Sequence, residues 1–235
     1  ISYLQIISLL TINLNIKWPT FIYDIIDGFN FVNLDIFSIS KHDLSCSLDT
    51  DYYNHFIIYL LIIPGLILSI YISYLLALKF GKRKDVIKDR FIYCLVLFIF
   101  LIYPLVGSSI LKIYKCEQIE DKYYLSEDFS IECFDTRWNI HAIVGGIFIF
   151  IYILGIPFIF YKILRNNLDL LNKHTPEAKK FKYRYGFMYV GYEPQYWWFE
   201  IVEMMKKIIL LATVIYLDET ATRILIAMLL CFAYL

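Results

Sequence analysis

Long apolar runs alternate with charged segments along this chain. Three of the runs exceed 20 residues without an Asp, Glu, Lys or Arg, and they cover residues 54–78, 91–111 and 139–161. A helix needs about 20 apolar residues to cross the hydrocarbon core of a bilayer, so each run is long enough to do so. The pattern therefore predicts three complete membrane spans.

A fourth span is expected near the C-terminal end, and it differs from the others because it carries charge. The apolar run 208–217 corresponds to about 15 Å of helix, which is half the thickness of a bilayer core. A helix over 196–217 would reach about 33 Å and could cross. Two outer runs, 1–14 and 221–235, are interpreted as partial spans, and for 1–14 a buried or interfacial helix is the alternative. The expected fold class is an all-α, polytopic transmembrane helical bundle.

Polar residues form a stripe along one face of the predicted fourth helix, at about 100° per residue. The stripe consists of Tyr196, Glu200, Glu203 and Lys207. Ionisable residues within a membrane usually face a bundle interior or a water-filled cavity, so the stripe is the candidate functional site. We expect Glu203 to pair with Lys207, four residues on, and Glu200 to remain the free carboxylate. The alternative is that 196–206 lies flat in the interface with its charges hydrated.

Two tryptophans, Trp197 and Trp198, stand at the beginning of the same segment. Tryptophan is enriched where the bilayer core meets the headgroups. Trp197 and Trp198 are therefore expected to be interface anchors.

The charges are distributed unevenly between the loops. Segments 79–90 and 162–186 together hold 13 Lys and Arg residues, whereas 16–53 and 112–138 hold six. Because short cytoplasmic loops carry an excess of Lys and Arg, the first two segments are predicted to be cytoplasmic and the other two extracellular or lumenal. The formal net charge is zero, so no basic excess favours nucleic acid as a partner. The expected partner is the lipid bilayer.

Three cysteines, Cys46, Cys116 and Cys133, fall in the segments predicted to lie outside. Disulfides persist outside the reducing cytosol, so the cysteines favour the same topology as the charges. Cys116 and Cys133 enclose a short loop, and we predict that they are paired. Because three cysteines leave one over, Cys46 is the competing partner.

No arrangement of residues in the sequence indicates catalysis. The four histidines are far apart, and none has the i, i+4 spacing of a zinc-binding helix. No nucleotide-binding loop or nucleophile–base pairing is recognisable. We expect no enzymatic activity, no metal and no cofactor.

The two ends of the chain indicate a fragment. The first residue, Ile1, is not a methionine, and the chain stops within the apolar run 224–235. We expect a single transmembrane domain over 1–235 that is truncated at both ends.

Several short motifs follow one another along the chain. They are Val32-Asn33-Leu34-Asp35, Tyr103-Pro104, Cys116 with Leu125, Asp128, Ser130-Ile131 and Cys133, Gly155-Ile156-Pro157, and the block Arg184-Tyr185-Gly186-Phe187, Tyr189, Tyr192, Trp197-Trp198 and Glu200. In this order they resemble the multi-span C-terminal membrane domain of very large protist surface proteins. Those proteins carry cysteine-rich, ephrin-receptor-like repeats, as do the cysteine-repeat modular proteins of apicomplexan parasites.

The resemblance implies about seven helices, of which five to six are represented here, beneath a cysteine-rich ectodomain. The resemblance does not supply an activity. Our interpretation is a domain of the plasma membrane or secretory pathway that anchors a receptor or adhesin-like protein and transmits its signal inward. Other membrane or surface proteins are then expected partners. The alternative is a TRP-like cation channel or transporter that uses Glu200 and Glu203. It is suggested by the similar layout of such channels, a cysteine-rich outer part over a multi-span domain.

Overall fold

The computed structural model describes residues 52–80, 84–171 and 175–217, together with 173, 222, 225 and 226. The predicted partial span 1–14 and Cys46 lie outside the described residues, as does most of 221–235. The described part of the chain is mostly helical, which confirms that element of the expected fold class.

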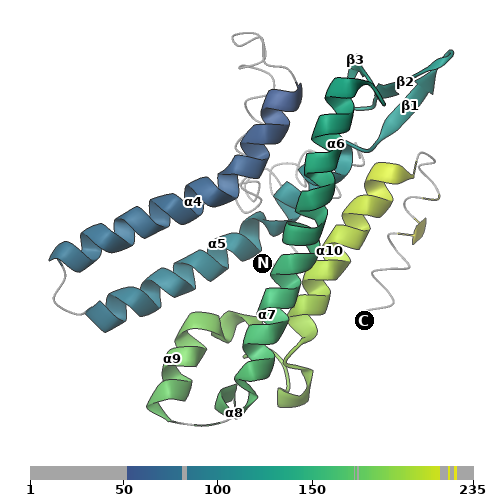
Figure 1. The fold of residues 1–235 in the computed structure, drawn as a ribbon. Helices are drawn as coiled ribbons and strands as arrows, with labels where there is room; N and C mark the ends of the chain where they lie inside the picture. Colours follow the sequence, from purple (N-terminus) through teal and green to yellow (C-terminus); the bar gives the residue numbers. More distant parts are fainter. Residues whose placement is uncertain are drawn as a thin grey trace, which may run out of the picture.

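Three helices in the described part are long and apolar enough to cross a membrane. The first is α4 (Tyr52–Phe80), and the second is α5 (Lys84–Lys112). The third is one continuous rod built from α6 (Thr136–Phe148), the π-helix η2 (Ile149–Leu154) and α7 (Gly155–Asn166). Figure 1 shows these rods with α10 beside α7. Large apolar side chains remain exposed along them, as at Leu61 (58%) and Phe150 (72%), which is the surface expected of helices that face lipid.

The last long helix, α10, runs from Phe199 to Tyr216 and packs against α5 and α7. It begins three residues later than the helix expected from 196. Pro194 starts a short 3₁₀ turn, η4 (Pro194–Tyr196), and a turn over 197–198 separates η4 from α10. Helix α10 has 18 residues and therefore extends about 27 Å. Because of its charged residues, α10 is not one of the three helices in the described part that qualify as spans by length and composition.

A small β-sheet replaces part of the loop expected over 112–138, so the all-α expectation is wrong for this segment. Strands β1 (Cys116–Ile119), β2 (Lys122–Leu125) and β3 (Asp128–Glu132) form an antiparallel meander in the order β1-β2-β3. The turn between β1 and β2 places Glu120 at a φ of 54°. Leu125, Cys133 and Trp138 form a separate buried cluster beneath the sheet.

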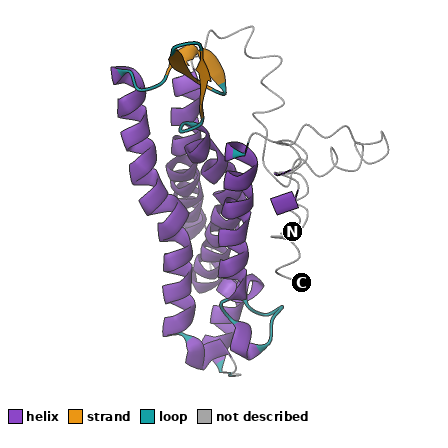
Figure 2. Cartoon of the chain, turned by 90° about the vertical axis from the view of Figure 1, so that its right-hand side faces the viewer, coloured by secondary structure: helices purple, strands orange, loops and turns teal. Residues whose placement is uncertain are grey.

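Short helices gather at the end of the bundle opposite the sheet (Figures 1 and 2). They are α8 (Leu168–Leu171), α9 (Pro176–Tyr185) and the 3₁₀ turn η3 (Gly186–Met188). Thr175 caps α9, because its side-chain oxygen accepts a hydrogen bond from the backbone N–H of Ala178. Pro176 occupies the first turn, where its missing N–H costs nothing.

The main core is centred on α5. Tyr103, Val106 and Ile110 are fully buried there, against residues of η2 and α10. The Tyr103 hydroxyl donates a 2.7 Å hydrogen bond to the carbonyl of Ile153 in the π-helix. At Gly107 a Cβ atom would lie only 2.4 Å from Cδ1 of Ile208, so the glycine allows α5 and α10 to approach closely.

Candidate functional site

The charged residues of α10 lie in the interior of the bundle. Glu200 and Glu203 are each 8% exposed, Lys206 is 6% exposed and Lys207 is 1% exposed. Two carboxylates and two ammonium groups form a set whose formal charges cancel. This matters because burying a charge costs free energy unless the charge is paired. Tyr196, the first residue of the predicted stripe, is separate from this set. It lies on η4 and is 46% exposed.

Glu203 forms an ion pair with a lysine that the sequence prediction did not use. Lys206 Nζ donates a 2.9 Å hydrogen bond to Glu203 Oε1, so the pair is made at i+3. Residues three and four positions apart both face each other on a helix, and this spacing could have identified Lys206. The Lys207 ammonium lies 4.5 Å from the centre of the Phe100 ring on α5, in the arrangement of a cation–π contact.

Glu200 is not the free carboxylate that was expected. The hydroxyl of Tyr192 donates a 2.6 Å hydrogen bond to Glu200 Oε2. Glu200 lies in the first turn of α10, where the helix dipole also favours a negative charge. The link joins α10 to the segment that precedes it.

That segment, 184–197, forms a cap over the end of the bundle. At its start, Arg184 donates hydrogen bonds from Nε and Nη2 to Oδ1 of Asp89 in α5, at 2.9 and 2.5 Å. The ring of Phe187 then packs edge-on against Phe100, with centroids 5.5 Å apart. Sequence reasoning missed Asp89, because nothing local marks a partner 95 residues away.

The two predicted interface anchors have different environments. The ring of Trp197 packs against Tyr161 of α7, with centroids 5.4 Å apart, and it borders the main core. Trp198 is 37% exposed. Trp197 therefore connects the cap to α7.

A pocket of about 160 Å³ is lined mostly by residues of the cap. Its aromatic residues are Tyr189, Tyr192 and Trp197, and its charged residues are Lys182 and Glu193. Burial raises the pKa of the Tyr189 phenol, so the group stays protonated and can act as a donor. The Tyr192 hydroxyl connects this pocket to Glu200.

At the opposite end of the bundle, a disulfide joins Cys116 to Cys133, whose Cα atoms are 6.4 Å apart. This separation lies within the range of protein disulfides. The bond connects the start of β1 to the residue that follows β3.

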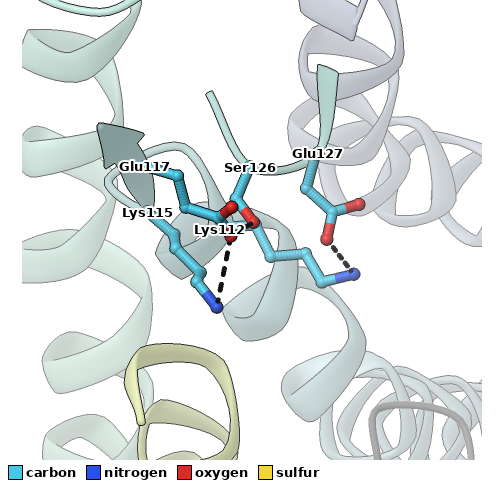
Figure 3. A network of polar contacts seen from close by, with 5 residues as sticks. All are labelled: Lys112, Lys115, Glu117, Ser126 and Glu127. Atoms are coloured by element: carbon cyan, nitrogen blue, oxygen red, sulfur yellow. Dashed lines mark hydrogen bonds and ion pairs between the residues drawn. The ribbon is translucent and has the colours of Figure 1, made fainter. Parts of the chain in front are cut away.

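Polar contacts cluster where α5 ends and the sheet begins, and Figure 3 shows them from close by. Lys112 forms an ion pair with Glu127 at 3.0 Å, and Lys115 lies 3.8 Å from Glu117. The Ser126 hydroxyl donates to the same Glu117 carboxylate at 2.5 Å. On the outer face of the sheet, the hydrogen bond from Lys122 to Glu132 raises the pKa of the lysine.

Across the residues that the structure describes, no three His, Cys, Asp or Glu side chains come together in a group that could hold a metal ion. The arrangement has the features of a buried charge network beneath a cap, at one end of a helical protein with three helices of membrane-spanning length.

One curated protein similar to this chain is "Cysteine repeat modular protein A" of Toxoplasma gondii. The two are 24% identical over 168 residues, which cover 66% of this chain and 5% of that protein. The chain thus spans about one twentieth of the length of this relative. The similarity supports a relationship to a cysteine-rich protist protein. No protein-family model matches the chain. No solved structure matches it.

Proposed function

We propose that this chain is a multi-pass membrane domain that anchors a larger cysteine-rich surface protein and couples its outer part to the inner face of the membrane. It belongs to the plasma membrane or the secretory pathway and has no enzymatic activity. Segments 79–90 and 162–186 lie in the cytoplasm, and 112–138 lies outside. The observation that carries the proposal is the presence of three membrane-length apolar helices with different polar structures at their two ends.

The outer structure is the disulfide-linked meander, which is suited to an oxidising compartment. The inner structure is the cap, where Arg184 of one basic segment contacts Asp89 of the other. This contact supports the placement of both basic segments on the same side of the membrane. The similarity to a cysteine-repeat protein supports an anchoring role for the domain.

Helix α5 is the element that would carry a signal between the two ends. It contacts the cap through Asp89 near its beginning, and it contacts the sheet through Lys112 at its last residue. Its 29 residues extend about 43 Å, enough to cross a bilayer core. The buried charges of α10 contact the same helix through Lys207 and Phe100.

Labelling of single introduced cysteines tests the proposed topology. Asp121→Cys, at the tip of the β1–β2 turn, should react with a membrane-impermeant maleimide in intact cells. Lys180→Cys, on α9, should react only after the cells are permeabilised. The parent chain treated in parallel gives the background from native cysteines. Reaction of both variants in intact cells would exclude the proposed arrangement.

A second function, a TRP-like cation channel or transporter, is favoured by one observation, the burial of Glu200 and Glu203 within α10. In a channel these carboxylates would attract the permeating cation. Liposomes that contain the purified chain should then pass a cation flux that Glu200→Gln reduces. For an anchor we expect no flux above that of empty liposomes, with or without the substitution.

A further inference from the structure

The pocket formed by the cap lies at the depth of the lipid headgroups if the helices cross the bilayer as proposed. Its Trp197 packs on Tyr161, the last residue of the uncharged run 139–161. One turn further along α7, Arg165 donates a hydrogen bond to the Tyr161 hydroxyl. Aromatic rings followed by basic residues mark the boundary between the bilayer core and its headgroups.

Tyr189 supplies an unused hydrogen-bonding group at this pocket. The residue is 7% exposed and lines the pocket. Within the described residues, its buried hydroxyl has no hydrogen-bond partner. A buried polar group of this kind is available to a further hydrogen-bonding partner, and a ligand in the pocket is one such partner.

Two side chains of opposite charge complete the lining, Lys182 from α9 and Glu193 from the segment before η4. Both are exposed, so they are accessible from the headgroup layer. The Glu193 carboxylate also accepts a 2.8 Å hydrogen bond from Gln195 Nε2, which helps to hold it in place. A cation alone would favour any anion, whereas a cation with a carboxylate favours a ligand that bears both charges.

We propose that this pocket binds the headgroup of a phospholipid that carries both a phosphate and a primary amine, as phosphatidylethanolamine does. Lys182 and the Tyr189 hydroxyl donate to the phosphate oxygens. Glu193 accepts a hydrogen bond from the headgroup ammonium. Leu171 and Val190, which also line the pocket, provide apolar contact for the glycerol end of the lipid. The inference rests on the membrane placement proposed above.

Native mass spectrometry of the purified chain, titrated with short-chain lipids, tests this proposal. Phosphatidylethanolamine should bind about tenfold more tightly than phosphatidylcholine, because a quaternary ammonium cannot donate a hydrogen bond to Glu193. Water-soluble phosphoethanolamine serves as the comparison for a source other than lipid. It lacks the glycerol end and should bind at least about tenfold more weakly than the lipid.

Three variants separate the contributions of the residues. Tyr189→Phe and Lys182→Gln should each weaken binding of phosphatidylethanolamine by about five- to tenfold. Glu193→Gln should bring its affinity to within about twofold of that for phosphatidylcholine, since only the amine contact is lost. Tyr183→Phe and Lys180→Gln are matched controls on exposed positions of α9 that do not line the pocket, and both should bind as the parent does.

The outcomes are distinguishable. Equal affinity of the parent chain for the two lipids, or unchanged binding by both Tyr189→Phe and Lys182→Gln, would overturn the headgroup site. Phosphoethanolamine that binds as tightly as the lipid would identify a soluble ligand in place of a phospholipid, and would overturn the proposal as well.

Incorporation into lipid nanodiscs is measured separately. A chain that fails to incorporate contradicts the proposed membrane function together with this inference, whereas one that incorporates but shows no lipid preference contradicts the inference alone.

Discussion

Arg184 donates two hydrogen bonds to a single carboxylate oxygen of Asp89. These bonds connect α9 and the cap to the first turns of α5. The Asp89 side chain is 13% exposed and that of Arg184 is 26% exposed, so water screens the pair only in part. Charge-assisted hydrogen bonds in such surroundings are stronger than neutral ones.

We expect Arg184→Ala to lower the free energy of unfolding by about 1–3 kcal/mol, because the Asp89 carboxylate then loses its donor. Denaturant unfolding of the purified protein in mixed micelles measures the change. Arg90→Ala, on an exposed neighbour of Asp89, is the matched control and should change stability by less than about 0.5 kcal/mol. Equal stability of the two variants would show that the contact contributes nothing to the fold.

The hydrogen bond from Tyr192 to Glu200 gives a second prediction. Tyr192→Phe removes only the hydroxyl and leaves a buried carboxylate without this donor, which should cost about 1–3 kcal/mol. Tyr196→Phe makes the same chemical change at a residue that is 46% exposed, and it should be close to neutral. The same unfolding assay compares them. A loss at Tyr196 as large as that at Tyr192 would refute the role given to the Glu200 contact.

The sequence predicts the long apolar helices well, because a run of more than about 20 uncharged residues has few other stable arrangements. It does not predict where α10 begins. Pro194 permits a helix to start at once, yet the chain makes a 3₁₀ turn there, and α10 follows only at Phe199. In the turn before α10, Trp197 packs against Tyr161, a contact that no local pattern encodes.

The sheet and the cap were missed for related reasons. Strands of four or five residues show too little alternation to be separated from a charged loop. Nothing in segment 79–90 distinguishes Asp89 from its neighbours, because its partner Arg184 is distant in sequence. The candidate stripe includes both carboxylates that are buried on α10. Its expected ion pair differs, because helical geometry allows Glu203 to meet a lysine at i+3 as readily as at i+4.

The disulfide gives a third prediction, which concerns the outer end. Replacement of Cys116 and Cys133 by serine should destabilise the chain by about 3 kcal/mol, the value that the chain-entropy model gives for a loop of this length. Thermal unfolding with and without reductant checks it, since reduction of the parent chain should produce a similar loss. Cys94→Ser removes a cysteine that is free and should leave the response to reductant unchanged. If the parent chain shows no response to reductant, the bond does not stabilise the meander.

The ion pair between Glu203 and Lys206 gives the last prediction. Variants of this pair distinguish buried charges that stabilise the fold from buried charges that serve transport. Glu203→Ala leaves the 6% exposed Lys206 without this partner and should cost about 3–5 kcal/mol, the range for breaking a buried pair. The double replacement of Glu203 and Lys206 by leucine removes both charges and should cost less than the single change, since a hydrophobic pair can replace a buried ion pair at little loss. Glu177→Ala, at an exposed carboxylate of α9 outside the pocket, controls for loss of negative charge. A double variant that is as unstable as Glu203→Ala would mean that the two residues do not act as a pair. Cation flux through liposomes is measured for the same double variant. An increase in that flux would favour the channel over the anchor.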